Sequence, residues 1–489
     1  MNRLLISMSF IATFFCCSSV YAQVQPANSP APPPSAEVAG QLSKSDDVTQ
    51  LLRLAAGFEA KGEYNNLIAT YQRVLELRPM AGNIQYELAA AYAMVNDKRH
   101  CYDLLLKMQA VGYAYDPSTD ERFAKAHGTE AWDYIVLNLQ ANAKPFGEGK
   151  VEMTLPKEDT LIESIAYDQK RKQLLAGSAR DGAVYRVSAD GKTLTPFITA
   201  NKDNQLRSVV AMQADNKRGH LWVTATGLPH FKRIEPTDYG KTAIYQFDLN
   251  DGKLIKRIDM PTATGPHLLD HIHVAADGRV FASDSAQKRI HLVAGDATRL
   301  VVQNPKLTHL RGVTTSDDGK LLYFADIEYG IFVLDLGTGK AVPMAAPATL
   351  TLFGVDGLYY WKGHLVAVQN SFPPARVMRL KLDASGTRIA SSLPLDAGHT
   401  QFEAPTRGVI EGDALYLIAN SQKPMYDRFG LLIDKNKLQG VSIWKSNLAF
   451  ALNAVIGNTP IPIKKAEYHR AGSRWHDGPR TWRRGCLCR

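Results

Sequence analysis

The sequence contains little cysteine, and most of it lies at the two ends of the chain. Of five cysteines, Cys16 and Cys17 lie near the N-terminus and Cys486 and Cys488 near the C-terminus, which leaves Cys101 alone between them. An internal disulfide framework is therefore excluded for the central part of the chain. The helical pattern around Cys101 predicts an inert, buried thiol and argues against a catalytic one.

Long hydrophobic runs are also missing, since no later stretch is apolar over the length that a membrane-spanning helix needs. At the start of the chain, a short apolar stretch from Leu4 to Phe15 is followed by small and polar residues up to Ala22. This pattern predicts an export signal over residues 1–22, cleaved after Ala22, and hence a periplasmic protein; an N-terminal membrane anchor is the alternative. The proline- and alanine-rich residues that follow predict an extended linker over 23–45.

The part of the chain that is expected to fold has little excess of positive over negative charge. The net charge is +9, but residues 464–489 carry six arginines and two lysines against one glutamate and one aspartate. No basic stripe for nucleic acid is evident in the remainder. Residues 449–489 predict an atypical, basic, disordered tail, which is either the product of an altered reading frame or a basic arm for nucleic acid or membranes.

Several catalytic motifs are absent. The chain has no Gly-x-Ser-x-Gly elbow of a serine hydrolase and no Cys/His spacing of a zinc site. Residues 337–340 read Gly-Thr-Gly-Lys but lack the remaining positions of a phosphate-binding loop. They predict a hairpin turn between two strands.

The N-terminal part of the chain contains a helical repeat. Between Val48 and Met108 large and small apolar residues recur at a spacing of 34, as in Leu54 and Leu88 or Leu67 and Cys101. This period resembles the tetratricopeptide repeat, which has two antiparallel helices per unit. We expect such repeats over residues 46–142, with capping helices in the last part. They would bind a peptide or protein, or brace the larger domain.

The part of the chain that follows the helical repeat alternates apolar and polar residues between Asp-Gly turn signals. Six strand-like segments recur every 40 to 60 residues or so: 173–176, 221–223, 280–282, 321–324, 365–367 and 415–418. That interval fits one four-stranded blade, so residues 150–448 predict an all-β, six-bladed β-propeller. The chain is therefore expected to be a multidomain protein, with an all-α repeat followed by the propeller.

A second strand-like segment precedes each of the six, and aligning these segments exposes one recurring position. It is occupied by Glu163, Val210, Asp270, Arg311, Asp356 and Thr406. If these segments are the innermost strands, the six side chains meet at one end of the central channel. Three carboxylates and a guanidinium crowded there require pairing or a bound cation, and therefore indicate a functional site.

Four segments of this part of the chain resemble the gluconolactonase and senescence-marker-protein (regucalcin-like) family. They read "ESIAYD", "GPHLLDHIHVAADG", "GVDGLYYWKGHLVAVQN" and "APTRGVIEGDALYLIANSQ". The resemblance covers about residues 160–446. It implies a six-bladed propeller with a divalent cation, often calcium, at the channel mouth, and hydrolysis of lactones or related esters by metal-polarised water.

Carried over by residue, Glu163 and Asp356 match the Glu and Asp metal ligands of that family. Asp270 stands where the family often has Asn, His271 replaces the Asp that follows, and Arg311 replaces an expected Asn ligand. Arginine cannot bind a cation. The resemblance thus implies either a calcium site of Glu163, Asp270 and Asp356, or a metal-free channel in which a guanidinium takes the place of the metal.

Three histidines close together, His267, His271 and His273, are either a source of a general base or hydrogen-bonded structural residues. Two functions remain open at this point. One is a lactone or ester hydrolase that uses Glu163, Asp270, His271 and Arg311. The other is a non-catalytic scaffold that binds a protein partner through the helical repeats and the propeller.

Overall fold

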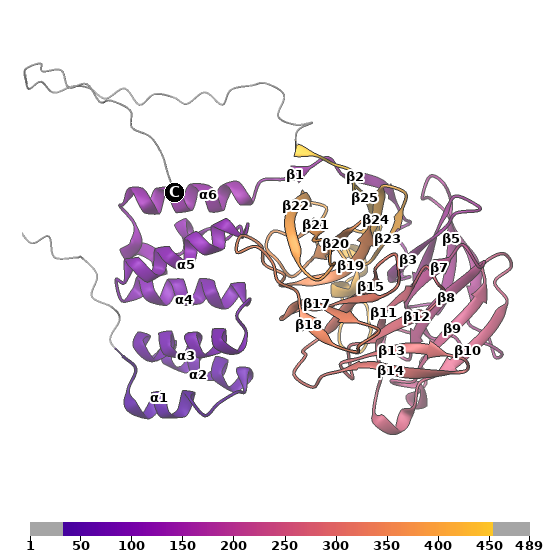
Figure 1. The fold of residues 1–489 in the computed structure, drawn as a ribbon, viewed down its shortest axis with the longest axis horizontal. Helices are drawn as coiled ribbons and strands as arrows, with labels where there is room; N and C mark the ends of the chain where they lie inside the picture. Colours follow the sequence, from indigo (N-terminus) through magenta and orange to yellow (C-terminus); the bar gives the residue numbers. More distant parts are fainter. Residues whose placement is uncertain (1–32, 453–489) are drawn as a thin grey trace, which may run out of the picture. The chain divides into compact units, whose positions relative to one another are not determined.

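The computed structural model describes residues 33–452 (Figure 1). Within them a helical region over residues 36–142 precedes a six-bladed β-propeller, which confirms the predicted fold class. The predicted export signal, the start of the predicted linker and the tail beyond residue 452 lie outside the described residues. None of the helices described here combines the length and the apolar character that crossing a bilayer requires.

The helical region repeats in pairs. Its elements are α1 (Ala36–Leu42), α2 (Val48–Ala60), α3 (Tyr64–Leu77), α4 (Gly82–Met94), α5 (Lys98–Ala110), the 3₁₀ helices η1 (Pro117–Thr119) and η2 (Glu121–Ala126), and α6 (Glu130–Asn142). The starts of α2 and α4, Val48 and Gly82, and those of α3 and α5, Tyr64 and Lys98, have the spacing that the sequence repeat predicts.

Side-chain caps set where several of these helices begin. Asp47 accepts hydrogen bonds from the backbone N–H groups of Thr49 and Gln50 at 2.9 and 3.2 Å, and Thr129 accepts one from Trp132 at 3.1 Å. Each cap satisfies an N–H group that has no partner within the helix. Cys101, on α5, is fully buried, and burial together with the nearby Asp97 carboxylate raises the pKa of its thiol to about 12. This confirms the predicted buried thiol.

The predicted linker over residues 23–45 extends too far at its C-terminal end, because helix α1 lies within it. Ser35 caps this helix by accepting a hydrogen bond from the N–H of Val38 at 3.3 Å. Val38 and Leu42 are buried in the core of the helical region. The apolar residues one turn apart outweigh the proline-rich composition that precedes them.

Six antiparallel sheets form the blades. Blade one contains β3 (Ile162–Asp168), β4 (Gln173–Ser178), β5 (Ala183–Val187) and β6 (Leu194–Thr199); blade two contains β7 (Ser208–Asp215), β8 (His220–Thr226), β9 (Thr242–Asp248) and β10 (Leu254–Asp259); blade three contains β11 (Leu269–Val274), β12 (Val280–Asp284), β13 (Arg289–Ala294) and β14 (Ala297–Gln303).

The remaining blades follow the same order until the last. Blade four contains β15 (Leu310–Thr315), β16 (Leu321–Asp326), β17 (Gly330–Asp335) and β18 (Ala341–Pro343); blade five contains β19 (Val355–Trp361), β20 (His364–Gln369), β21 (Arg376–Leu382) and β22 (Ile389–Ala397), with β1 (Phe146–Gly147) at its edge; blade six contains β23 (Gly408–Glu411), β24 (Ala414–Ile418), β25 (Ser442–Asn447) and β2 (Lys150–Thr154). Residues 337–340 form the turn between β17 and β18, as predicted.

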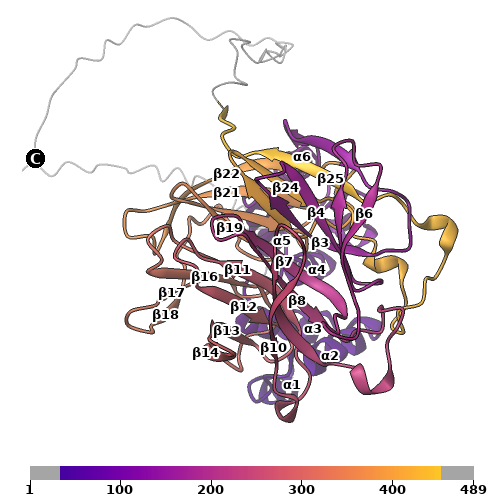
Figure 2. The same cartoon turned by 90° about the vertical axis from the view of Figure 1, so that its right-hand side faces the viewer.

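Two features of this ring position the site. The first strands of successive blades, among them β3, β7, β11 and β19, lie beside one another around the middle of the propeller (Figure 2). Strand β15 lies between β11 and β19. These first strands are therefore the innermost strands that the sequence alignment assumed. Blade six takes its outermost strand, β2, from the start of the propeller, so that pairing of β2 with β25 closes the ring.

Candidate functional site

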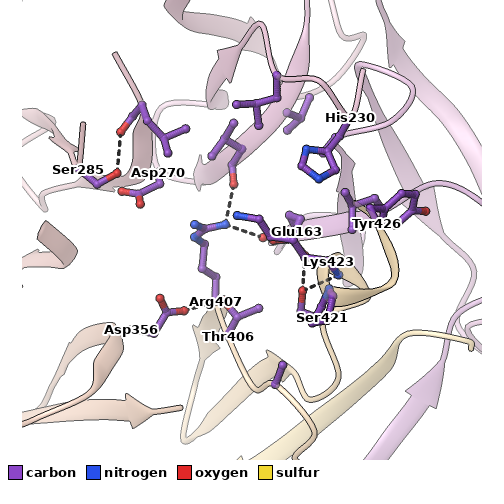
Figure 3. Close-up of a pocket in the computed structure, with 18 of the residues that line it drawn as sticks. Glu163, His230, Asp270, Ser285, Asp356, Thr406, Arg407, Ser421, Lys423 and Tyr426 are labelled. Carbon is purple, nitrogen blue, oxygen red and sulfur yellow. Dashed lines mark hydrogen bonds between the residues drawn. The ribbon is translucent and has the colours of Figure 1, made fainter. Parts of the chain in front are cut away.

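A cavity of about 630 Å³ opens at one end of the ring of inner strands. All six residues of the recurring position line it: Glu163, Val210, Asp270, Arg311, Asp356 and Thr406. The side chains that the blade alignment brought together therefore do share one cavity, which we call the mouth cavity (Figure 3). Their roles as catalytic groups or metal ligands stay predictions.

A backbone irregularity recurs where these residues lie. The pairing of the first two strands of a blade shifts register between Ile162 and Ser164 in blade one, and the same shift spans Val210, Asp270, Arg311 and Asp356 in the next four blades. An unpaired, bulged residue bends its strand and re-aims its side chain. The bulges explain why five separate strands present these side chains to one cavity.

Arg311 holds two of the three carboxylates together. Its Nη1 bonds to Asp270, and its Nε lies 3.3 Å from Oδ1 of Asp356. Asp356 also accepts a hydrogen bond of 2.6 Å from the hydroxyl of Thr406. Asp270 and Asp356 are buried, at 1% and 6% exposure, so each negative charge needs such partners.

Asp270 is ionised despite its burial. Burial opposes the charged form, but the contact with His271 and the positive charges of Arg311 and Arg407 outweigh it and lower the pKa of Asp270 to about 2. His271 is buried with its Nδ1 3.4 Å from Asp270, and it lines a second cavity of about 160 Å³ instead of the mouth cavity. The structure thus places His271 behind Asp270 and not on the wall of the mouth cavity.

The third carboxylate has different neighbours. Glu163 accepts a hydrogen bond of 2.6 Å from the hydroxyl of Ser421. Arg407 lies between the blades, where its Nη1 donates to the backbone carbonyls of Glu163 and Val210 at 3.1 Å each (Figure 3). Arg407 lines both cavities, so its side chain lies where they meet.

Two long loops form the rim of the mouth cavity, and sequence reasoning missed their residues. His230 lies between β8 and β9, and Lys423, Tyr426 and Arg428 lie between β24 and β25. Arg180 ties the loops together by donating to the carbonyls of His230 and Gly430 at 2.8 and 3.0 Å. The length of these two connections within a blade is the signal that could have revealed them.

The other two histidines do not reach the mouth cavity. His273 lines the second cavity, where its Nε2 accepts a hydrogen bond of 3.2 Å from the N–H of Thr315. His267 is buried in blade three, with its Nδ1 2.5 Å from Asp284. Among the residues that the structure describes, the imidazoles that line the mouth cavity are those of His230 and His309. Burial, Lys423 and Arg180 lower the pKa of His230, so this ring is neutral at pH 7.

The side chains of the mouth cavity fit a calcium ion poorly. Calcium takes about six to eight oxygen ligands. Of the three carboxylates that the resemblance implies, Asp270 and Asp356 flank the Arg311 guanidinium, and Glu163 bonds to Ser421. A guanidinium donates hydrogen bonds, accepts none and repels a cation. Arg311 pairs with Asp270 and Asp356 in the place that a cation would need, and the choice between a calcium site and a metal-free channel stays a prediction.

One family model matches within the propeller. The family model described as major royal jelly protein matches residues 207–300. No curated protein matches this chain. The chain is similar in structure to the PQQ-bound aldose sugar dehydrogenase of Streptomyces coelicolor, at 13% identity and a TM-score of 0.41 over 62% of this chain and 99% of that one.

Two further solved structures are similar to a comparable extent. A gluconolactonase of Xanthomonas campestris has 15% identity and a TM-score of 0.40 over 63% of this chain and 92% of its own. A luciferin-regenerating enzyme has 12% identity and a TM-score of 0.42 over 62% of this chain and 95% of its own. Sequence identities and TM-scores this low assign no function to this chain.

Proposed function

We propose that the protein hydrolyses a lactone or small ester in the mouth cavity without a metal ion. One observation carries this proposal: a carboxylate, Glu163, shares a single cavity with two guanidinium groups, Arg311 and Arg407. Ester hydrolysis needs a base for the attacking water and a positive or hydrogen-bonding group for the developing oxyanion. These three side chains supply both.

In the proposed reaction Glu163 takes a proton from water, whose oxygen attacks the substrate carbonyl. Negative charge develops on the carbonyl oxygen, beside the guanidinium of Arg407 or Arg311. The C–O bond to the leaving alkoxide then breaks, and Glu163 returns its proton to that alkoxide. Asp270 and Asp356 hold Arg311 in place, and His271 supports Asp270 from behind.

The rim indicates a substrate with an apolar part. Phe429, Leu431 and Ile433 follow the lining residue Arg428 in the loop between β24 and β25; they do not line the mouth cavity itself, and they are 61%, 63% and 67% exposed. Exposed apolar side chains next to a binding cavity favour ligands that carry hydrocarbon. Lactones with alkyl chains and aryl or alkyl esters are the compounds to test first.

The test is a panel of lactones and esters assayed by acid release, with the full chain in EDTA and in calcium. We expect hydrolysis that EDTA does not abolish. Glu163→Gln should lower kcat by about 100-fold or more, since that is the usual contribution of a general base. Glu411→Gln is the matched control, because Glu411 is the last residue of β23 and lines another cavity instead of the mouth cavity.

Absence of turnover above background on the whole panel would refute hydrolysis. Activity that EDTA removes and calcium restores would instead support the calcium site of Glu163, Asp270 and Asp356. Equal activity of the two variants would remove Glu163 from the mechanism.

A second candidate function is binding of a protein by the helical region, which would then be a tetratricopeptide-type module. Tyr134 and Leu137, one turn apart on α6, are 57% and 66% exposed. Neighbouring exposed apolar side chains on a helix face are typical of binding surfaces. A partner recovered by the wild type but not by a Tyr134→Ser, Leu137→Ser variant would support this function.

Export to the periplasm is also part of the proposal, and it rests on the pattern of residues 1–22. Mass spectrometry of the mature protein should find Gln23 as its first residue. A mature protein that still contains Leu4–Phe15 would contradict export by cleavage.

A further inference from the structure

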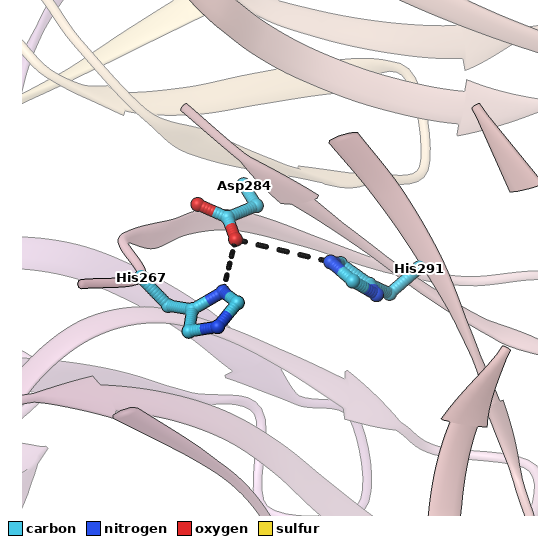
Figure 4. A group of neighbouring side chains, drawn as sticks. All are labelled: His267, Asp284 and His291. Atoms are coloured by element: carbon cyan, nitrogen blue, oxygen red, sulfur yellow. Dashed lines mark hydrogen bonds and ion pairs between the residues drawn. The ribbon is translucent and has the colours of Figure 1, made fainter. Parts of the chain in front are cut away.

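Blade three contains a buried group of two histidines and an aspartate that the proposed reaction does not use. His267 precedes β11, Asp284 ends β12, and His291 lies on β13 (Figure 4). Their exposures are 4%, 0% and 7%. One ligand atom of each residue, a ring nitrogen or a carboxylate oxygen, lies within 4.8 Å of the corresponding atoms of the other two.

The two oxygens of Asp284 have different surroundings. Oδ1 accepts hydrogen bonds from the backbone N–H groups of Leu268 and Gln287 at 3.1 Å each. Oδ2 faces the histidines, 2.5 Å from Nδ1 of His267 and 3.8 Å from Nε2 of His291. The backbone therefore orients the carboxylate and leaves one oxygen to the two rings.

The contact between His267 and Asp284 needs a proton or a metal ion between the two atoms. Nε2 of His267 lies 2.9 Å from the carbonyl oxygen of Pro261 and 3.1 Å from the hydroxyl of Thr264, so it either donates to the carbonyl or accepts from the hydroxyl. Nδ1 faces the carboxylate oxygen of Asp284, where a bare lone pair would be repelled. Either Nδ1 holds a proton, or a metal ion binds both atoms.

His291 distinguishes these alternatives. Its Nε2 is buried and has no hydrogen-bond partner among the described residues, yet it is directed at the same oxygen of Asp284. A proton on Nδ1 of His267 would satisfy the pair of His267 and Asp284 and leave Nε2 of His291 unused. A buried polar atom without a partner is costly, and a metal ion would bind it together with the other two.

The equivalent aspartate of the next blade shows what a purely structural residue looks like. Asp326 holds the same register position on β16, opposite Leu310, as Asp284 holds opposite Leu269. Its Oδ1 accepts from the N–H groups of Glu328 and Tyr329, and its Oδ2 from those of Thr308 and His309. No ring nitrogen is needed there, so the histidines around Asp284 go beyond the structural role of this position.

We propose that His267, Asp284 and His291 bind a divalent transition-metal ion of the zinc type. Zinc prefers imidazole nitrogen and carboxylate oxygen, with ligands about 2.0–2.2 Å from the ion and hence about 3.3 Å from one another. The separations of 2.5 and 3.8 Å lie on either side of that value, so small side-chain shifts suffice. The contact from Nε2 of His267 to a backbone carbonyl is a frequent outer-sphere partner of a metal-bound histidine.

The experiment uses the full chain purified without a histidine tag, stripped with a chelator and then dialysed against zinc or cobalt. We expect about one zinc per chain, a melting temperature that rises with zinc, and d–d absorption bands of bound cobalt. His291→Gln should weaken zinc binding by more than about 100-fold, since loss of an outer-sphere partner alone costs about 10- to 100-fold. His273→Gln is the matched control, because it changes another histidine of the same blade.

A folded wild-type protein that binds neither ion stoichiometrically would overturn the proposal, and so would zinc binding that His291→Gln leaves unchanged. If His291→Gln does not fold, His267→Gln and the cobalt spectrum of the wild type decide the matter. A nuclear magnetic resonance signal showing two protons on the His267 ring in the presence of zinc would also contradict it. None of these outcomes depends on whether the mouth cavity hydrolyses esters.

Discussion

Arg311 contacts Asp270 and Asp356 in the mouth cavity, and its charge takes the place that a cation would need. Replacing it with asparagine removes that charge and supplies an amide oxygen. In EDTA we expect Arg311→Asn to lower the free energy of unfolding by about 3–5 kcal/mol, because two buried carboxylates lose their partner. Calcium should restore part of this loss.

Thermal unfolding of wild type and variant, each with and without calcium, measures the effect. The wild type serves as the control, and its melting temperature should not respond to calcium. A wild-type protein that calcium stabilises would show that Arg311 does not exclude the ion.

His273 makes the stability depend on pH. Its Nε2 accepts a hydrogen bond from the N–H of Thr315, which requires the neutral ring, and burial lowers its pKa from 6.5 to about 4. Between these values the unfolded chain binds a proton that the folded chain does not, so stability falls as the pH falls from about 6.5 to 4.

Urea unfolding of wild type and His273→Gln at pH 7.5 and pH 4.5 tests this dependence. The loss of free energy of unfolding on acidification should be roughly 2 kcal/mol smaller in the variant. Parallel losses in the two proteins would show that His273 is protonated in the folded state.

Sequence reasoning found the six mouth-cavity residues of the recurring blade position but not their geometry. Aligning the blades placed Glu163 and Asp356 correctly, because equivalent positions of a repeated blade face the same axis. The bulges that present these side chains are irregularities in the backbone pairing of two strands, and no pattern of side chains in the sequence marks them. Arg407 was missed because its side chain crosses to the carbonyls of two other blades, and such contacts depend on the folded ring.

At the scale of elements, the six recurring apolar segments predicted the second strand of every blade, as with residues 280–282 within β12. The closing strand β2 was not predicted, although Val151 and Met153 alternate with exposed Lys150 and Glu152. Alternation alone marks a strand but cannot name its partner, and β25 lies at the other end of the propeller.

Closure by β2 can be tested on its inner face. Met153 packs against the apolar cluster between blades six and one. Met153→Asp should therefore lower the free energy of unfolding by about 2–3 kcal/mol, because it buries a charge at the closing seam. Lys150→Asp, on the exposed face of the same strand, is the control and should change stability by less than about 0.5 kcal/mol.

Chemical denaturation followed by tryptophan fluorescence reports both changes. Equal effects of the two substitutions would mean that the inner face of β2 contributes no more than its outer face to the stability of the ring.

At the scale of the whole molecule, the sequence predicted two domains and left open whether the helical region braces the propeller, but it identified no residues that join them. Phe372, in the loop between β20 and β21, belongs to the apolar core of the helical region and stacks on Tyr113 with centroids 4.3 Å apart. Such a contact joins a loop tip to a helix end and leaves no periodic signal. It places a residue of the propeller in the apolar core of the helical region.

Arg376 lies at the centre of this contact. It donates to the carbonyl oxygen of Val111 at 2.9 Å and to Gln369 at 2.7 Å, and its guanidinium lies over the ring of Phe372. Arg376→Gln should lower the free energy of unfolding by about 2–3 kcal/mol, because the Val111 carbonyl loses its partner and the stacking on Phe372 is lost. We expect the two domains of the wild type to melt together, and differential scanning calorimetry of the variant should resolve separate melting.

The matched control is a second arginine at the same junction. Arg78 pairs with Glu328 of the propeller, but the side chains are 23% and 35% exposed. Solvent screens such a pair, so Arg78→Gln should cost less than about 1 kcal/mol and leave a single transition. If both variants keep one transition at equal cost, the junction at Arg376 does not couple the domains, and the helical region would be an independent module on the propeller.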